Sequence, residues 1–333
     1  MRRKGYPLWQ PKPDDGVPLA YLREGVQIGD LGILNEFGGF DYIFNVCRPA
    51  DDPINDGRVP EDFKPITGLK DQDTRKREDE YWPGTHVASR DVDIQRGFLP
   101  LSPSPLPNAP VEIGGGLSFG SRSSRGALLV LPEGATRRDH LNLSAFHSYA
   151  TQYAKSWYAY INGPLGRQAT NGSLYLVTGC DKARAWGVAS FSGARPGDVL
   201  LEFVPVPSRV PDSTHPDYYF RLTNSASASS GSDCRFGNQS GCVFLRGFKI
   251  AIRTPKFTSL QLGVVVSSIM DLDSGNLVPN RKRAAIVLSS SRFLKFSLGK
   301  KKVVGSGIQE STPLGSSVDI QVFPSRHPVC TMF

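Results

Sequence analysis

The feature that most constrains the fold is a succession of short apolar runs that begins at Ser173. These runs are rich in Val, Ile, Phe and Tyr, and polar or glycine-containing turns separate them. They cover Ser173–Thr178, Ala185–Phe191, Asp198–Pro205, Tyr218–Thr223, Cys242–Arg253, Val264–Met270, Ala284–Leu288 and Phe293–Leu298. Many short runs of this kind are typical of an antiparallel sandwich or a barrel-like sheet. We therefore predict a mainly β fold of the α+β class.

Composition agrees with many short strands. Glycine and proline make up about 18% of the 333 residues, against roughly 12% in average usage. The longest apolar runs, such as Ala127–Leu131, are far shorter than the ~20 residues that cross a membrane. The basic N-terminus lacks the apolar stretch of a signal peptide. We expect a cytoplasmic or nuclear protein without a transmembrane segment.

One segment, near residues 140–162, predicts an amphipathic helix. Apolar residues recur there every three or four positions, which places them on one helical stripe: Leu143, Phe146, Ala150, Tyr153, Trp157 and Tyr160. Thr136 or Asp139 can cap the start of this helix. The sequence Asn162-Gly163-Pro164 is expected to end it. His147 lies beside the stripe and is expected to be partly buried.

The chain before residue 110 is expected to be a loop-rich region packed on a body of residues 111–333. It contains one hairpin signal, in which Val26–Leu34 and Phe40–Val46 flank a glycine-containing turn. The charged residues 61–80 are expected to form a surface loop or a short helix. Residues 99–110 include five prolines and predict a linker.

A further connection is predicted in the second half of the chain. The low-complexity run Asn224–Ser232, NSASASSGS, lies between two predicted strands. Its composition predicts a flexible loop.

The polar segment Gly179–Lys182 is the leading candidate for a site. It places a thiol, a carboxylate and an amine together between two apolar runs. A nucleophilic Cys180 needs a nearby base and a positive environment to form a thiolate. His147 is the nearest candidate base in the sequence, and Lys182 and Arg184 can supply positive charge. Cys180 and His147 are therefore the catalytic candidates.

A structural interpretation of the same segment stays open. Cys180 can be a small thiol packed at the end of a strand, and Asp181 with Lys182 can close a turn as an exposed ion pair. No signature of a Cys–His enzyme surrounds them. If the segment binds a partner instead, the binding residues are expected to be Asp181, Lys182, Arg184 and Trp186.

The positive charge of the chain is concentrated near its C-terminus. Eight Lys and Arg residues lie between Arg281 and Lys302 without an intervening acidic residue, and this number equals the formal net charge of +8. Such a segment can bind nucleic acid or an anionic lipid surface. The candidate anion-binding residues are Arg281, Lys282, Arg283, Lys300, Lys301 and Lys302. The alternative is a pair of basic turns that flank an exposed hairpin.

The five cysteines give no sign of a metal centre. They include no CxxC pair, and the five histidines show no ligand spacing with them. We expect neither a metal nor a cofactor. Cys234 and Cys242 could meet across a hairpin, but a reducing compartment favours free thiols.

Several segments resemble a family of intracellular proteins from mushroom-forming basidiomycete fungi. They are GYPLWQPKP, GDLGILNEFGGFDYIFNVCRPADDPIN, LSFGSRSSRGALLVLPEGA, WYAYINGPLGR and NGSLYLVTGCDKARAWGVASF, which together span roughly residues 5–195. The resemblance implies a shared domain layout. No activity is established for the family, so the resemblance implies no mechanism.

The functional expectation is a non-catalytic interaction or regulatory module with a protein partner. A large β scaffold with long polar loops and no convergent catalytic motif favours it. Two alternatives stay open. One is a cysteine-dependent enzyme that uses Cys180, and the other is nucleic-acid or anionic-lipid binding through residues 281–302.

Overall fold

The computed structural model describes residues 4–89, 97–98, 108–113, 116–195, 197–210, 213–253 and 263–269. These residues all belong to one compact unit. The strands predicted at Ala284–Leu288 and Phe293–Leu298 lie outside the described residues, as do the basic segment 281–302 and residues 99–107 of the predicted linker.

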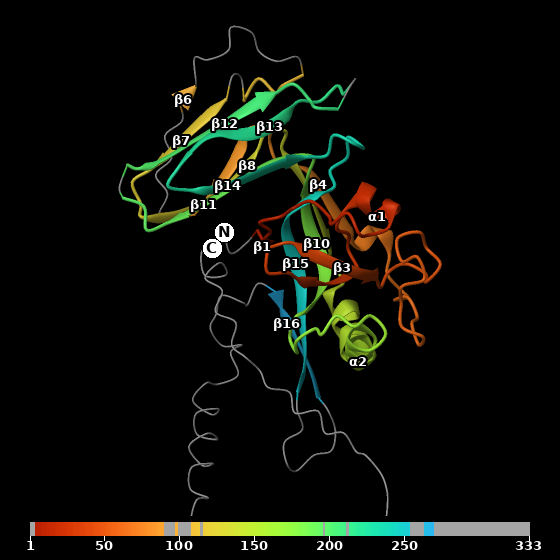
Figure 1. Ribbon diagram of the computed structural model, residues 1–333. Coiled ribbons are helices and arrows are strands. Elements are labelled where there is room, and N and C mark those ends of the chain that lie inside the picture. The colour runs from red at the N-terminus through yellow and green to blue at the C-terminus, as the bar shows by residue number, and fades with distance from the viewer. Residues whose placement is uncertain are drawn as a thin grey trace, which may run out of the picture. The chain divides into compact units, whose positions relative to one another are not determined.

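The described chain is mostly strand, with one long helix (Figure 1). The first elements are β1 (Tyr6–Pro7), α1 (Leu19–Glu24), β2 (Asp30–Leu34), β3 (Phe40–Asn45), a 3-10 turn (Asp71–Asp73), β4 (Thr74–Tyr81), β5 (Thr85–Ala88), β6 (Gly97–Phe98), β7 (Leu117–Ser121), β8 (Arg125–Leu131) and β9 (Ala135–His140). They are followed by α2 (Leu143–Asn162), β10 (Leu174–Ala183), β11 (Ala185–Ser192), β12 (Val199–Val206), β13 (Asp217–Asn224), β14 (Ser227–Ser232), β15 (Gly241–Arg253) and β16 (Gly263–Ser268). The mainly β, α+β fold predicted from the sequence is confirmed.

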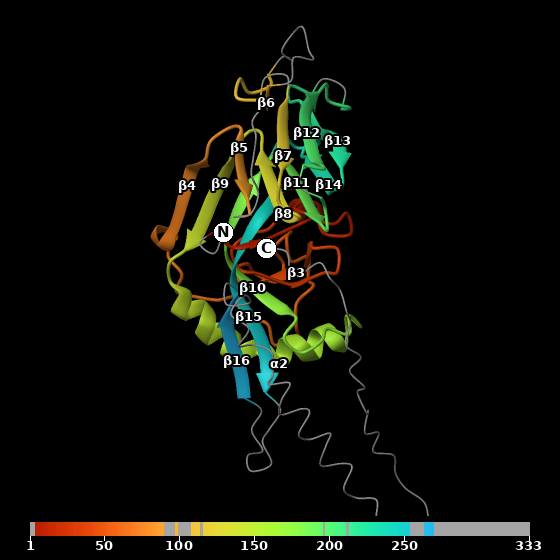
Figure 2. The same ribbon diagram turned by 90° about the vertical axis from the view of Figure 1, so that its left-hand side faces the viewer.

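Strand β10 lies at the centre of the largest sheet. In the described chain this sheet has eight strands, with the order β1-β15-β10-β2-β3, β16 beside β15, and β4 and β9 joined to β10. One edge of β10 pairs with β15 over nearly its whole length. Its other edge is shared, because β2 pairs with Leu174–Leu176 and β9 pairs with Gly179–Lys182. Figure 2 shows β4 and β9 side by side next to β10.

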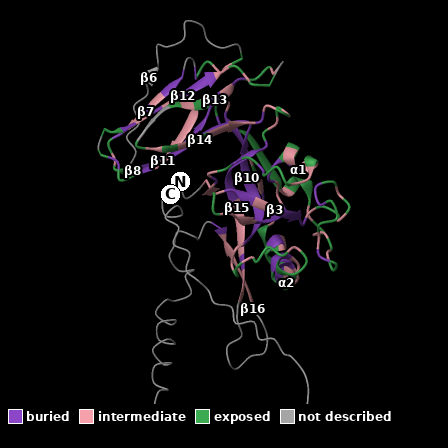
Figure 3. Ribbon diagram, viewed as in Figure 1, coloured by how far each residue is buried: buried purple, intermediate pink, exposed green. Residues whose placement is uncertain are grey.

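Helix α2 covers one face of this sheet. Its buried side chains, among them Phe146, Trp157 and Ile161, pack against residues of the sheet such as Phe44 and Leu176. The buried residues of α2 and of the sheet thus form a common core (Figure 3). Burial of apolar surface in such a core stabilises the fold by about 25 cal/mol for each Å² removed from water.

The start of α2 differs from the predicted cap. Asn142 is the N-cap, and its side chain accepts a hydrogen bond from the Ala145 N–H at 3.2 Å. Thr136 and Asp139 lie in β9 instead. The predicted cap is wrong because Thr136 and Asp139 belong to a strand whose backbone pairs with β10.

Two four-stranded sheets form a sandwich in the described part of the chain. Their orders are β14-β11-β8-β5 and β13-β12-β7-β6. Apolar side chains from both sheets, including Val130, Ala189, Phe119 and Phe203, form one buried cluster. The sequence predicted an antiparallel sandwich or a barrel-like sheet, and these two sheets form a sandwich.

The predicted flexible loop Asn224–Ser232 is wrong, because most of it is strand β14. This strand pairs with β11 from Ser227 opposite Ser190 to Ser232 opposite Ala185. Its small residues have a steric reason: a Cβ added at Gly231 would lie 2.7 Å from the Trp186 ring. At this one position of the run, Trp186 occupies the space that a side chain would need.

The charged residues 61–80 are also not a loop throughout, because Thr74–Tyr81 form β4. The strand pairs with β9, with Lys76 opposite Arg138 and Arg77 opposite Arg137. Charged residues on edge strands prevent unwanted pairing with other chains. Because β4 is charged, it lacks the apolar alternation from which a strand is predicted.

The hairpin predicted near the N-terminus is confirmed as β2 and β3. Gly38 in its turn has φ 77°, a left-handed conformation that favours glycine. Strands from the first 110 residues pair with strands from the rest of the chain, since β2 joins β10 and β5 joins β8. The division at residue 110 stays a prediction.

Candidate functional site

The segment Gly179–Lys182 is part of strand β10, and the loop predicted there is wrong. Its backbone is paired on both sides, with Cys180 opposite Arg138 in β9 and Leu245 in β15. The β15 register shifts between Val177 and Gly179 and again between Asp181 and Lys182. The extra residue is Thr178 of β10 at the first shift and Val243 of β15 at the second. Successive side chains of a strand point to opposite faces, so Asp181 and Lys182 lie in different surroundings.

Asp181 is fully buried in a cluster of charged groups. Its carboxylate accepts a hydrogen bond from the Tyr81 hydroxyl at 2.6 Å and pairs with Arg246 Nη2 at 2.7 Å. Arg246 also pairs with Asp139, which in turn accepts from Arg137 Nε at 2.6 Å. Burial raises the pKa of Asp181, while Arg246 and Tyr81 oppose this rise. The predicted Asp181–Lys182 ion pair is therefore replaced by a pair between Asp181 and Arg246.

Cys180 is buried on the other face of β10, with an exposed fraction of 1%. Its sulfur lies 3.7 Å from the Val26 carbonyl oxygen. Burial raises the pKa of the Cys180 thiol to about 11, although Lys182 and Arg246 oppose it. At neutral pH the sulfur is thus a thiol, which is a poor nucleophile.

His147 differs from the prediction of partial burial, because it is exposed on α2. Its ring contacts the Phe248 ring with centroids 5.7 Å apart. The contacts described for Cys180 and for His147 share no residue. The structure therefore does not bring the two catalytic candidates together.

Lys182 is the residue of this segment that borders a pocket. Its side chain is almost completely buried, with an exposed fraction of 5%. The Nζ ammonium donates a hydrogen bond to the backbone carbonyl of Glu24, at the last residue of α1. In the described chain no carboxylate forms an ion pair with this ammonium.

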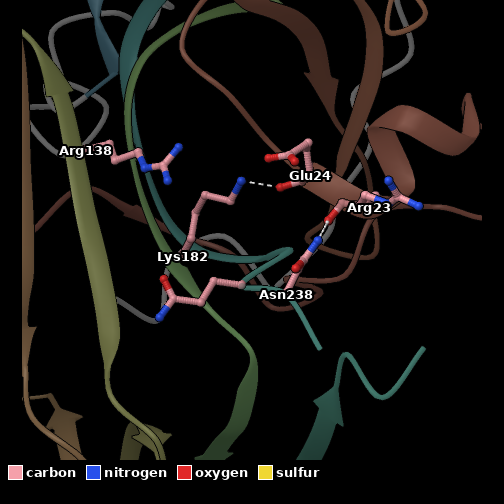
Figure 4. A pocket seen from close by; sticks show the side chains of 6 residues that line it. Arg23, Glu24, Arg138, Lys182 and Asn238 are labelled. Atoms are coloured by element: carbon pink, nitrogen blue, oxygen red, sulfur yellow. Dashed lines mark hydrogen bonds between the residues drawn. The ribbon is translucent and has the colours of Figure 1, made fainter. Parts of the chain in front are cut away.

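The pocket has a volume of about 220 Å³. Its lining comes from α1, β9, β10 and the connection before β15: Arg23, Glu24, Arg138, Lys182, Asn238 and Gln239. Figure 4 shows Arg138 and Lys182 reaching into the same space, with the Glu24 carboxylate close by. The Arg23 guanidinium points away, and it lies 5.5 Å from the centre of the Phe236 ring.

Two contacts fix the wall that faces Lys182. Asn238 Nδ2 donates to the Arg23 carbonyl at 3.2 Å, which ties the connection before β15 to α1. Gly25 ends α1 with φ 65°, and a Cβ at this position would collide with the Ser240 carbonyl. Glycine is therefore required there both for its backbone conformation and for space.

The pocket has an excess of positive charge. Of the charged groups on the lining residues, Arg138, Lys182 and Glu24 lie at the pocket and sum to a charge of +1, while the Arg23 guanidinium points away. Within the described ranges, the Arg138 guanidinium forms no hydrogen bond or ion pair. Lys76 lies opposite Arg138 on β4 and forms an ion pair with Glu78. An unpaired guanidinium beside a buried ammonium can receive an anion.

The remaining candidate binding residues serve the fold. Arg184 forms an ion pair with Glu133 and donates to the Pro216 carbonyl at 3.0 Å, and it is buried. Trp186 is buried against the glycines at 231 and 241. Of the four predicted binding residues, only Lys182 lines the pocket. Sequence reasoning missed Arg23, Glu24, Arg138, Asn238 and Gln239, which come from distant segments without a shared motif.

A buried acid lies under α1, close to this region. The Asp30 carboxylate accepts hydrogen bonds from the Tyr21 hydroxyl at 3.0 Å, Gln27 N–H at 2.6 Å and Asn45 Nδ2 at 2.7 Å. Burial raises the pKa of Asp30 to about 7, while these hydrogen bonds and the charge of Lys182 oppose the rise.

This raised pKa predicts a pH-dependent stability. Between the ordinary pKa of 3.8 and the folded value of about 7, the folded state keeps a proton that the unfolded chain releases. Stability therefore falls as the pH rises through this window. Between about pH 5 and about pH 8, the free energy of unfolding of the wild type should fall by about 2–3 kcal/mol more than that of the Asp30→Asn variant. Urea unfolding of both proteins at several pH values measures this difference, and parallel pH profiles would contradict it.

The remaining candidate groups are the cysteines, the possible metal ligands and the basic segment. In the described ranges, no three His, Cys, Asp or Glu side chains gather to hold a metal. Cys234 and Cys242 are free thiols, and Cys234 Sγ contacts the Asp217 carboxylate. Neither described helix combines the length and the apolar character that a membrane crossing needs. The candidates Arg281, Lys282, Arg283, Lys300, Lys301 and Lys302 lie outside the described residues.

Comparisons with known proteins leave the site to be judged from its own residues. No family model matches the chain, and no curated protein matches it. Among solved structures, it is similar to the Gasdermin A3 membrane pore determined by cryo-electron microscopy, at 11% identity. The match covers 79% of this chain and 86% of the other, with a TM-score of 0.25. A TM-score this low supports no inference about function.

Proposed function

We propose that this chain is a non-catalytic interaction module that binds an anionic group of its partner in the pocket at Lys182. One observation carries the proposal: an ammonium that is only 5% exposed, and hydrogen-bonded to a backbone carbonyl, borders a pocket with a positive lining.

The energetic argument concerns the donors of Lys182. A buried charge costs free energy unless it is paired and hydrogen-bonded. A lysine ammonium has three N–H donors, and the Glu24 carbonyl accepts from one of them. An anion in the pocket can accept hydrogen bonds from the remaining donors and can pair directly with the ammonium.

Arg138 supports the same ligand from a second strand. It projects from β9 into the space that Lys182 borders (Figure 4). Arginine binds oxyanions through two parallel N–H donors, and such charge-assisted hydrogen bonds are stronger than neutral ones. Cationic groups from two strands therefore border the same pocket.

The size of the pocket favours a group over a whole small molecule. Sites for drug-sized ligands measure ~300–1,000 Å³, and this pocket measures about 220 Å³. A single charged group at the end of a side chain or metabolite matches this volume. Recognition of one group is what an interaction module requires.

Replacing Lys182 with Met tests the proposal. Calorimetric titration with sodium phosphate and with sodium acetate should show saturable binding of at least one anion to the wild type. Loss of a charged hydrogen-bond donor is expected to weaken this binding about 10- to 100-fold. Bound anion should also raise the melting temperature of the wild type and leave that of the variant unchanged.

The matched control is Arg125→Gln, an exposed arginine at the start of β8 outside the pocket. This variant lacks one positive charge of the chain but keeps the pocket unchanged, so its affinity for the anion should equal that of the wild type. Equal anion binding by the wild type and Lys182→Met would reject the proposed function. If both variants weaken anion binding equally, the affinity depends on the net charge of the chain and not on the pocket, and the proposed function is also rejected.

A further inference from the structure

Two buried groups of opposite charge contact the same short helix, α1. The Tyr21 hydroxyl of this helix donates a hydrogen bond to Asp30 Oδ2 at 3.0 Å. At the end of the helix, the Glu24 carbonyl accepts from Lys182 Nζ (Figure 4). Tyr21 and Glu24 belong to the same six residues, and the Gly25 N–H donates to the Tyr21 carbonyl at 2.6 Å. The segment that borders the pocket is thus fixed to Asp30 as well as to Lys182.

Asp30 and Lys182 also interact through their charges. Asp30 is completely buried, and Lys182 is 5% exposed. Burial raises the pKa of Asp30 to about 7, and the positive charge of Lys182 opposes this rise. Buried charges are screened much less than exposed ones. A change in the charge of one group is therefore felt by the other.

The other titratable groups around Asp30 stay neutral near neutral pH. They come from α1, from β3 and the residues after it, and from β10: Tyr21, Tyr42, Cys47 and Cys180. Burial raises the pKa of each of these hydroxyl and thiol groups. Among the groups of this cluster, Asp30 is therefore the one whose charge changes near neutral pH, and Lys182 is the cation that faces it.

On these grounds, and resting on the proposed function, we infer that protonation of Asp30 controls how tightly the Lys182 pocket binds its anion. When Asp30 has taken a proton from solvent, the charge of Lys182 is available to the anion. When Asp30 is ionised, its negative charge attracts the same ammonium and repels the anion. The anion therefore binds more tightly as the pH falls. Bound anion in turn favours the protonated form of Asp30, because the coupling between two sites is reciprocal.

Calorimetric titration of the full chain with sodium phosphate and with sodium acetate tests this inference. The wild type is compared with Asp30→Asn, which carries a neutral amide at every pH. Both anions take up protons themselves, but the ratio of the two affinities at each pH cancels this contribution. The wild type should bind as tightly as Asp30→Asn at about pH 5.5 and about tenfold more weakly at about pH 8.5.

The matched control is Asp15→Asn. The Asp15 side chain is 88% exposed and pairs with Lys12 on the surface, outside the lining of the pocket. This variant lacks the same negative charge of the chain, so its affinity should depend on pH as that of the wild type does. A pH dependence that disappears in both variants would overturn the inference.

A second measurement follows Asp30 itself, by ¹³C NMR of its carboxyl carbon. Lys182→Met should raise the pKa of Asp30 in the absence of anion, because the charge that opposes protonation is gone. Saturating sodium phosphate should raise the pKa of Asp30 in the wild type, because the anion compensates the same charge. This measurement needs no substitution at Asp30. An Asp30 titration that neither change affects would overturn the inference.

The outcomes separate this inference from the proposed function. Suppose that Lys182→Met weakens anion binding but the affinity ratio of wild type to Asp30→Asn stays constant with pH. This result would overturn the control by Asp30 and keep the anion pocket. Absence of binding of both anions by the wild type at every pH would reject both the inference and the proposed function.

Discussion

Replacing Arg246 with Met is expected to lower the free energy of unfolding by about 3–5 kcal/mol. The Arg246 guanidinium is mostly buried, pairs with Asp181 and Asp139, and donates to the Lys4 carbonyl at 2.6 Å. Methionine fills much of the volume but leaves the Asp181 carboxylate buried without its counter-charge. Urea unfolding followed by circular dichroism measures the change.

Two further variants make this result specific. Arg58 pairs with Asp56 at 3.6 Å on the surface, so Arg58→Met should change stability by less than about 1 kcal/mol. The double variant Arg246→Met, Asp181→Asn should recover much of the loss, because the amide carries no charge and its oxygen still accepts from the Tyr81 hydroxyl. Similar losses for Arg246→Met and Arg58→Met would contradict the buried cluster.

Trp157→Ala is expected to cost about 3–5 kcal/mol of unfolding free energy. Trp157 is 1% exposed and lies where α2 meets the large sheet, with its ring centre 6.2 Å from that of Phe44. Alanine would remove the largest buried side chain of this core and leave a cavity. Calorimetric melting should show a single transition at a lower temperature.

Trp82→Ala is the matched control for this prediction. Trp82 is 69% exposed, so its removal takes away little buried area and should change stability by less than about 0.5 kcal/mol. If both tryptophan variants lose the same stability, α2 does not form the core of the sheet.

Regular hydrophobic patterns made much of this fold predictable from the sequence. The stripe from Leu143 to Tyr160 marked α2, and the two apolar runs around Gly38 marked the hairpin of β2 and β3. Burial of one face produces such periodicity directly. The cap of α2 was predicted at the wrong residue because several polar residues before Leu143 have capping side chains.

Strands without an apolar pattern could not be predicted in this way. β4 is almost entirely charged, and β14 consists of serine, alanine and glycine. Their strand conformation depends on partners that are distant in sequence: β9 for the first strand, and β11 with Trp186 for the second. The partner strands cannot be predicted from the composition of β4 or β14 alone.

The candidate site shows the same limit. The sequence predicted Lys182 as a binding residue, and Lys182 borders the pocket, but the predicted turn at Gly179–Lys182 is part of strand β10. Polar residues inside a central strand are rare unless they find buried partners, and the partner of Asp181 is Arg246, 65 residues later. Arg138 and Glu24 reach the pocket through strand pairing and through the end of α1. No spacing rule connects these positions.

The central claim is that the Lys182 ammonium receives an anion. The most direct test observes this ammonium by ¹⁵N NMR of the lysine side chains during separate titrations with sodium phosphate and sodium acetate. The account predicts a saturable shift of the Lys182 Nζ resonance, with the same dissociation constant as calorimetry, and no shift of the surface residue Lys70. A Lys182 resonance that stays unchanged while other lysines shift would contradict the account.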